Sequence, residues 1–107
     1  MDHDIYSFLY TLGLSENYTG FGYIVDAVRV ALQEPESLQM VTKWLYPEVA
    51  KHYKKNWKSV ERNIRTAISV MWDSASWKME AMTGCPWGVK PTNAQFIAAL
   101  THRVASV

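Results

Sequence analysis

The chain has 107 residues, of which 49% are hydrophobic and 20% are charged, and its formal net charge is +1. This length suits one domain with a single modest core, so we expect one domain over residues 1–107. The composition is ordinary for a soluble globular protein, and no apolar run approaches the roughly 20 residues that span a bilayer. These values exclude a membrane-spanning protein, and the small net charge by itself indicates no partner.

The first residues and the single cysteine indicate the compartment. Residues 1–4 include two aspartates and no lysine or arginine, unlike the basic start of a signal peptide. Cys85 is the only cysteine and can form no internal disulfide, which fits a reducing cytosol. We interpret Cys85 as a small apolar loop residue rather than a nucleophile, and we expect a cytoplasmic protein.

Apolar residues recur at helical spacing in the N-terminal half. Asp4 can cap a short helix that Gly13 ends. A second helix follows residues 20–22 and ends before Pro35, and a third is predicted over residues 35–45. The residues expected to face the core in these three helices are Ile5, Phe8, Leu9, Leu12, Ile24, Val25, Val28, Leu32, Leu38, Val41, Trp44 and Leu45.

The clearest helical signal lies in the middle of the chain. Pro47 suits the first residue of a short fourth helix over residues 47–53, and a brief polar connection over residues 54–56 follows it. Asn56 is a suitable N-cap for a fifth helix over residues 57–72. Its expected core-facing residues, at three- and four-residue steps, are Trp57, Val60, Ile64, Ala67, Ile68 and Met71.

The helical signal weakens toward the C-terminus. Residues 74–82 are predicted to form a further short helix and residues 84–88 a loop, and the last helix begins near Thr92. The expected core-facing residues of the last helix are Phe96, Ile97, Leu100 and Val104. Because no segment shows the alternation of a strand, we predict an all-α fold, a compact bundle of about six helices.

Positive charge is concentrated in residues 43–65. These 23 residues hold seven of the chain's eleven lysines and arginines against two glutamates, a local charge of +5. A nearly neutral chain with one basic segment is typical of a surface that binds a polyanion. A solvated helical face would give the same pattern, so charge alone leaves both interpretations open.

The helices at 47–53 and 57–72, with their short connection, have the layout of a helix-turn-helix over residues 47–72. In that motif the N-terminal part of the second helix contacts base edges in the major groove. Arginine can bond to guanine, glutamate to cytosine, and serine or threonine to several bases. The predicted base-reading residues are Lys58, Ser59, Glu61, Arg62, Arg65 and Thr66. The predicted phosphate-contacting residues are Lys51, Lys54, Lys55 and Asn56.

A second interpretation exists for Glu61 and Arg65. They lie four residues apart on a predicted helix, so they can form a surface ion pair that contributes only about 0.3–0.5 kcal/mol. The two interpretations are compatible, because such a pair could hold Arg65 in a conformation that reads a base. The helix pattern alone is a weak signal for DNA binding, and the local charge strengthens it.

Two motifs in this region also resemble those of a known family. Residues 44–51 read WLYPEVAK and residues 60–68 read VERNIRTAI. At the same spacing they resemble the leucine-tyrosine-proline-glutamate and valine-glutamate-arginine-x-isoleucine-arginine motifs of one effector domain. It is the C-terminal domain of the sporulation-initiating response regulator of endospore-forming bacteria, the stage-zero sporulation protein A family. Residues 22–28 and 90–98 resemble the family's second and last helices, so the resemblance covers about residues 5–104.

The resemblance implies a six-helix domain that binds a short DNA box. Family members dock head-to-tail on tandem boxes and activate or repress transcription at sporulation promoters. It therefore implies double-stranded DNA, a second copy of the chain and RNA polymerase as partners. It also implies a location at the nucleoid in a bacterial cytoplasm.

The resemblance also implies roles for individual residues. Glu61, Arg62 and Arg65 match recognition-helix residues that face the DNA in the family. Two other contact positions have changed, because Ser59 stands where the family has arginine and Thr66 where it has histidine. Lys58 replaces a small polar residue and can compensate for the charge lost at position 59. These departures affect the exact target box more than DNA binding itself.

Two further departures concern whole segments. Residues 73–89 differ from the family, with Trp77, Met79 and residues 85–87 unusual, so surfaces for polymerase or for a neighbouring protomer are expected to differ. Family members also carry an N-terminal phosphoacceptor receiver domain, for which this chain has no room. We expect either an excised domain or a stand-alone protein outside phosphorelay control, and the helix that directly follows Met1 favours the second.

The sequence gives little support to an enzyme. The three histidines, His3, His52 and His102, share no ligand spacing with one another or with Cys85. No glycine-rich loop follows a predicted strand, so no phosphate-binding loop is indicated. We therefore predict no enzymatic activity, no catalytic residue, no metal and no cofactor.

The serious alternative is a protein-interaction module that modulates a full-length regulator or RNA polymerase with little DNA binding of its own. Aromatic residues between Trp77 and Trp87 could anchor such a partner, although a local core beneath a loop is the favoured interpretation. Because Arg62 and Arg65 are retained, we favour DNA binding over this alternative.

Overall fold

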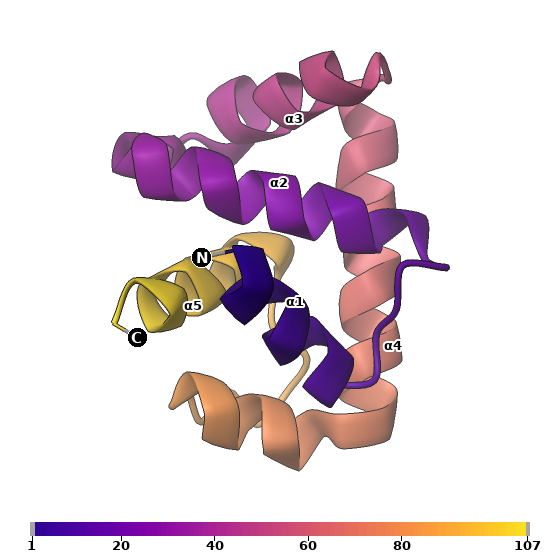
Figure 1. Cartoon of the computed structure of the whole chain (residues 1–107), viewed down its shortest axis with the longest axis vertical. Helices are drawn as coiled ribbons and strands as arrows, with labels where there is room; N and C mark the ends of the chain where they lie inside the picture. Colours follow the sequence, from indigo (N-terminus) through magenta and orange to yellow (C-terminus); the bar gives the residue numbers. More distant parts are fainter. Residues whose placement is uncertain (1, 107) are drawn as a thin grey trace.

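The computed structural model describes residues 2–106, and this part of the chain is all-helical, without a strand. Its α-helices are α1 (Asp2–Thr11), α2 (Thr19–Gln33), α3 (Tyr46–Tyr53), α4 (Trp57–Thr83) and α5 (Asn93–Ala105) (Figure 1). No helix within residues 2–106 is both long and apolar enough to cross a membrane. The all-α prediction is confirmed, with five α-helices in the described chain instead of about six.

The prediction of a single helix over residues 35–45 is wrong. Pro35–Gln39 form a 3-10 turn and Val41–Leu45 form a π-helical turn, with φ −137° and ψ 52° at Met40 between them. A 3-10 turn holds fewer residues per turn than an α-helix and a π turn holds more. Together they bring Leu45 and Tyr46 into the core at the start of α3, so the apolar spacing is satisfied without one regular helix.

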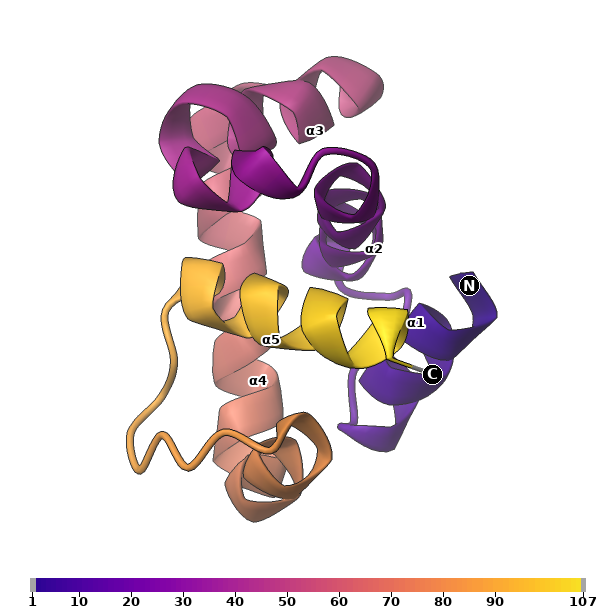
Figure 2. The same cartoon turned by 90° about the vertical axis from the view of Figure 1, so that its left-hand side faces the viewer.

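The short helix expected over residues 74–82 is present, but it is continuous with α4. The backbone of Ala75 has φ −153° and ψ 42°, which are not helical angles, and α4 is kinked there. Figures 1 and 2 show the part of α4 after this kink lying across the lower end of the molecule. The straight part of α4 therefore ends close to the boundary predicted at residue 72.

The core forms around α2, which lies between α3 on one side and α1 and α5 on the other, while α4 runs across it (Figure 1). The expected core-facing residues that are buried are Ile5, Leu9, Leu12, Ile24, Val25, Val28, Leu45, Val60, Ile64, Ala67, Ile68, Met71, Phe96, Ile97, Leu100 and Val104. Those that are only partly buried are Phe8, Leu32, Leu38, Val41, Trp44 and Trp57. Because α2 is buried on nearly every side, the other helices each present one apolar stripe to it.

The crossing of α2 and α4 depends on Gly20. A Cβ atom at this position would lie 2.3 Å from the backbone oxygen of Asn63 and 2.8 Å from the Cβ atom of Ala67, both on α4. A backbone oxygen and a methyl group next to the main chain cannot move without moving the helix. The absence of a side chain at Gly20 therefore allows the two backbones to approach closely.

We expect Gly20→Ala to lower the free energy of unfolding by about 1–3 kcal/mol through overpacking, measured by urea denaturation. Gly22→Ala is the comparison, because its Cβ atom would meet the Tyr53 hydroxyl, at 2.9 Å, at the end of an exposed side chain, so it should cost at most the hydrogen bond of that hydroxyl. Both substitutions gain the same helix propensity in α2. Equal free energies of unfolding for the two variants would contradict the close approach at Gly20.

Candidate nucleic-acid interface

The turn between α3 and α4 consists of Lys54, Lys55 and Asn56, as predicted. Lys54 has left-handed backbone angles, φ 54° and ψ 46°, and its N–H donates to the carbonyl oxygen of Lys51 at 3.4 Å. The N–H of Lys55 donates to the carbonyl oxygen of Ala50 at 2.9 Å. These two bonds form a Schellman motif, which closes the end of α3. The main chain thus fixes the turn and leaves all three side chains exposed.

The start of α4 is fixed by the predicted N-cap. The Asn56 side-chain oxygen accepts a hydrogen bond from the Lys58 N–H at 2.7 Å. Such a cap satisfies one of the backbone donors that the first turn of a helix leaves unpaired. The direction of α4 relative to α3 is therefore set within three residues by local hydrogen bonds.

The predicted base-reading residues lie on the outer side of α4. Its inner side is the buried stripe that includes Val60, Ile64 and Met71. The residues that α4 exposes in its first turns are Lys58, Arg62, Arg65 and Thr66. Because they are separated by three or four residues, Lys58, Arg62 and Arg65 follow one another along the helix.

Glu61 and Ser59 lie at the two edges of this outer side and are partly buried. The predicted ion pair is present, with Arg65 Nη1 2.7 Å from Glu61 Oε2. The Ser59 hydroxyl, in contrast, accepts a hydrogen bond from the Asn63 side chain at 3.3 Å, and its carbonyl oxygen accepts one at 2.8 Å. Ser59 is thus engaged with its own helix, whereas Glu61 orients an arginine.

The lysines of this region and Arg62 are not neutralised by acidic neighbours. Within residues 43–65 the ion pairs of the structure have His52 and Arg65 as their cations. The predicted site residues that form no ion pair among the described side chains are Lys51, Lys54, Lys55, Lys58 and Arg62. Lys58 also extends along the ring of Trp57, with Nζ 5.9 Å from the ring centroid. The basic segment therefore presents uncompensated charge to solvent.

Contacts with α2 hold α3 in place behind this surface. His52 Nδ1 lies 2.6 Å from Oδ2 of the buried Asp26, and the Tyr53 hydroxyl donates to the carbonyl oxygen of Gly22 at 3.2 Å. Burial raises the pKa of Tyr53, and the nearby charge of Asp26 raises it further. The phenol therefore stays neutral at ordinary pH and remains a hydrogen-bond donor.

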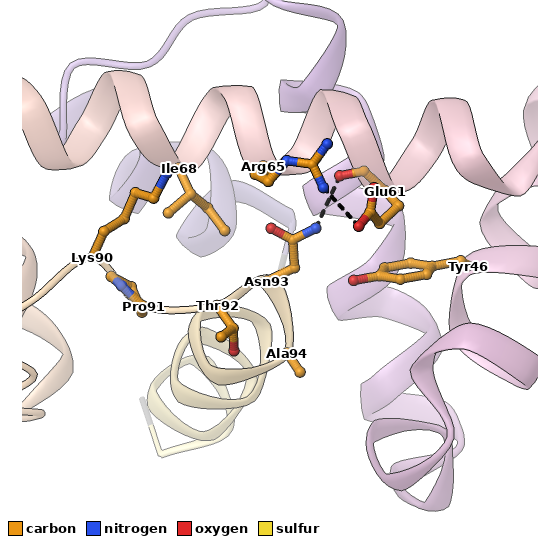
Figure 3. Close-up of a pocket in the computed structure, with 9 residues that line it drawn as sticks. All are labelled: Tyr46, Glu61, Arg65, Ile68, Lys90, Pro91, Thr92, Asn93 and Ala94. Atoms are coloured by element: carbon orange, nitrogen blue, oxygen red, sulfur yellow. Dashed lines mark hydrogen bonds and ion pairs between the residues drawn. The ribbon is translucent and has the colours of Figure 1, made fainter.

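A pocket of about 370 Å³ lies between α4, the start of α3 and the start of α5. Figure 3 shows Asn93 between Tyr46 and the pair formed by Glu61 and Arg65. The Asn93 side chain donates to the backbone oxygen of Glu61 at 2.9 Å. Burial raises the pKa of Tyr46, while a hydrogen bond with Asn93 lowers it. Asn93 therefore ties α5 to the turn of α4 that carries Glu61.

Sequence reasoning missed Asn93 and Lys90 as parts of this region. Lys90 is exposed in the loop before α5, and its Nζ donates to the Ser69 hydroxyl on α4 at 2.7 Å. Both residues fall in the 90–98 segment that the family resemblance had singled out. Only the fold brings that segment next to residues 61–69, so no local pattern could have assigned it to the interface.

The two tryptophans after the kink in α4 differ in burial. Trp87 is partly buried against the core, as a local core beneath a loop predicts. That prediction is wrong for Trp77, which is 70% exposed. Lys78 extends along its ring, with Nζ 5.7 Å from the centroid. Trp77 lies on the part of α4 after Ala75, which packs on the core through the buried side chain of Met79, and Trp77 itself points to solvent.

The candidate metal ligands are also dispersed. Within the described residues no three His, Cys, Asp or Glu side chains come together in a group that could hold a metal ion. Cys85 lies partly buried after the end of α4. His52 is engaged by Asp26, with Glu48 Oε2 3.5 Å from its other ring nitrogen.

Comparison with known families agrees with the predicted resemblance. The family model described as "Sporulation initiation factor Spo0A C terminal" matches residues 5–104. The match covers nearly the whole chain and includes both helices of the candidate interface, the turn between them and α5 up to Val104.

We expect Lys54→Gly to raise the free energy of unfolding by about 0.5–1 kcal/mol, because glycine adopts the left-handed angles of this position without the steric penalty of a side chain. Lys55→Gly is the matched control, since Lys55 does not have a positive φ. That substitution removes the same charge but only adds flexibility, so it should lower the free energy of unfolding. The two values from thermal denaturation should therefore differ in sign, and a loss of stability in Lys54→Gly would contradict the strain at this turn.

Proposed function

Because the chain belongs to the family of C-terminal domains of the sporulation initiation factor Spo0A, a family of DNA-binding effector domains of a transcription regulator, we propose that it reads a short DNA box with α4. In this proposal α3 and α4 act as a helix-turn-helix, and the recognition helix, residues 57–72, lies in the major groove. The observation that carries the proposal is the exposed row of Lys58, Arg62 and Arg65 directly after a rigid turn.

The three charged residues of the second and third turns of α4 would read bases in different ways. Arg62 is exposed and has no ion-pair partner among the described side chains, so its guanidinium is available to bond to guanine N7 and O6. Arg65 is held by Glu61, which reduces the conformational entropy that it would lose on binding. Glu61 has a second carboxylate oxygen that could accept from a cytosine amino group.

The other proposed contacts divide by position. Lys58, Ser59 and Thr66 complete the base-reading set. Lys51, Lys54, Lys55 and Asn56 lie on α3 and on the turn, where the phosphate backbone would pass. Contacts with phosphates fix the register of a protein on DNA without reading sequence. The changes at Ser59 and Thr66 would shift the preferred box at one edge of the reading surface.

We further propose that two copies bind head-to-tail on tandem boxes and that the chain acts on RNA polymerase at the nucleoid. The second candidate function is a protein-interaction module, and the exposure of Trp77 favours it, since aromatic side chains are the commonest anchors of protein interfaces. The retained basic row supports DNA binding as the primary function.

Binding to DNA tests the proposal directly. Fluorescence anisotropy on a duplex with two tandem family-type boxes, beside a scrambled duplex, should show tighter binding to the boxes and a steep loss of affinity as salt rises. Weak and equal binding to both duplexes would indicate a shifted box, to be found by selection from random DNA. No binding to any duplex would refute the proposal and favour the interaction module.

We expect Arg62→Ala to weaken binding to the boxes by about 1–3 kcal/mol and to relax the preference at one base pair. The matched control is Arg103→Ala, which removes the same charge from an exposed residue in the last turn of α5. It should change affinity by less than about 0.5 kcal/mol. If Arg62→Ala kept the full preference for the boxes, the assignment of α4 to the major groove would be wrong.

Lys55→Ala should act differently from Arg62→Ala, because a phosphate contact carries no sequence information. We expect it to weaken binding to the boxes and to the scrambled duplex by the same factor. The slope of log affinity against log salt concentration should fall by about 1. A loss confined to the boxes would instead place Lys55 against a base.

A further inference from the structure

We propose that Lys90 is a phosphate-contacting residue of this interface and that it binds the DNA strand opposite to the one held by the turn at residues 54–56. This inference rests on the proposed function and extends it. It adds a second basic anchor from a different part of the chain, the loop between α4 and α5.

The first argument is the position of Lys90. Its Nζ atom donates to the hydroxyl of Ser69 at 2.7 Å, and Ser69 lies one turn after Arg65 on α4. In Figure 2 the loop before α5 runs along the side of α4 that faces away from α1 and α2. Lys90 and Arg65 line the same pocket (Figure 3). Lys90 therefore continues the basic row beyond Arg65.

The second argument is that the loop holds Lys90 in place. The N–H of Gly88 donates to Oε2 of Glu80 at 2.6 Å, which ties the loop to the last turn of α4. On the other side of Lys90, Pro91 is buried. Thr92 and Gln95 then form a capping box at the start of α5. A lysine fixed in this way loses less conformational entropy on binding than a lysine on a flexible loop.

The third argument is charge. Lys90 forms no ion pair with any side chain that the structure describes. The bond to Ser69 uses one of the three donors of its ammonium group, and two donors remain for phosphate oxygens. Glu61, the carboxylate that shares the pocket, is already paired with Arg65 at 2.7 Å.

The spacing along α4 indicates which strand Lys90 would reach. Asn56 and Ser69 are 13 positions apart, which corresponds to about 20 Å at a rise of 1.5 Å per residue. The major groove is about 12 Å wide between the two phosphate backbones that border it. Cations at both ends of this stretch can therefore contact opposite strands while Arg62 and Arg65 lie between them. The kink at Ala75 turns the rest of α4 away beyond this point.

The first test compares Lys90→Gln with Lys78→Gln. Both remove one positive charge, but Lys78 lies after the kink, against the ring of Trp77. We expect Lys90→Gln to weaken binding to the tandem boxes and to the scrambled duplex by a common factor of about three to ten, and to lower the salt slope by about 0.9. Lys78→Gln should leave affinity and slope unchanged within twofold. Thermal denaturation of both variants checks that the fold is retained.

Ser69→Ala separates the charge from the hydrogen bond that positions it. This variant keeps the Lys90 ammonium and should lower affinity by less than about twofold with an unchanged salt slope, since the counterions released depend on charge. A loss equal to that of Lys90→Gln would show that Lys90 acts through Ser69 and would overturn the direct contact.

The second test locates the strand. Single neutral methylphosphonates are placed in turn at each phosphate that borders the box, and the wild type is compared with Lys90→Gln and Lys55→Gln. A methylphosphonate at the phosphate that Lys90 binds should weaken binding of the wild type and of Lys55→Gln but not of Lys90→Gln. That phosphate should lie across the groove from the one whose replacement no longer weakens binding in Lys55→Gln. If the two phosphates identified in this way lay on the same strand, the strand assignment would be overturned.

The failure of this inference is distinguishable from the failure of the proposed function. If wild type prefers the boxes and Arg62→Ala relaxes the preference at one base pair, the proposed function stands. The inference is then overturned alone if Lys90→Gln matches Lys78→Gln in affinity and salt slope. If wild type binds no duplex, both are refuted.

Discussion

The close approach of α2 and α4 at Gly20 is the constraint on which the rest of the structure depends. Because no side chain separates the two backbones, the carbonyl oxygen of Asn63 and the methyl group of Ala67 face α2 directly. This fixes the rotation of α4 about its own axis. Once Asn63 and Ala67 face α2, the geometry of a helix places Arg65, two positions from each, on the opposite side, with Arg62 beside it. The packing of α4 against α2 therefore determines which side chains α4 exposes on its outer side.

The two ends of the straight part of α4 are fixed by different means. At the start, the Schellman bonds of Lys54 and Lys55 and the Asn56 cap set the direction within a few residues. Farther along, Asn93 reaches from α5 to the backbone of Glu61. The local bonds follow from the sequence of the turn, whereas the second contact needs the complete fold. A surface that presents several charged side chains in register needs both, because an error of one ångström at either end would misplace the side chains between them.

Much of this architecture could be predicted from the sequence, and the exceptions have physical causes. The stripe from Val60 to Met71 repeats at helical spacing, so the inner and outer sides of α4 follow from periodicity alone. The turns over 35–45 could not be predicted, because their apolar spacing fits a regular helix and only the packing of Leu45 and Tyr46 selects another backbone. Lys90 was missed because its contact with Ser69 spans 21 positions in sequence, and a lysine in a loop carries no periodic signal.

The positions that depart from the family pattern are distributed unevenly over this surface. Glu61, Arg62 and Arg65, which match the pattern, lie toward the centre and toward the edge that Asn93 supports. Ser59 and Thr66, which do not match it, lie toward the opposite edge. The hydroxyl of Ser59 accepts a hydrogen bond from Asn63, whose carbonyl oxygen is the atom nearest to Gly20 at the crossing. A longer side chain at position 59 would project past this edge, whereas the short side chain of serine forms a hydrogen bond within α4. Substitution at one edge can thus change which bases are reached while the crossing, the turn and the central arginines keep their geometry.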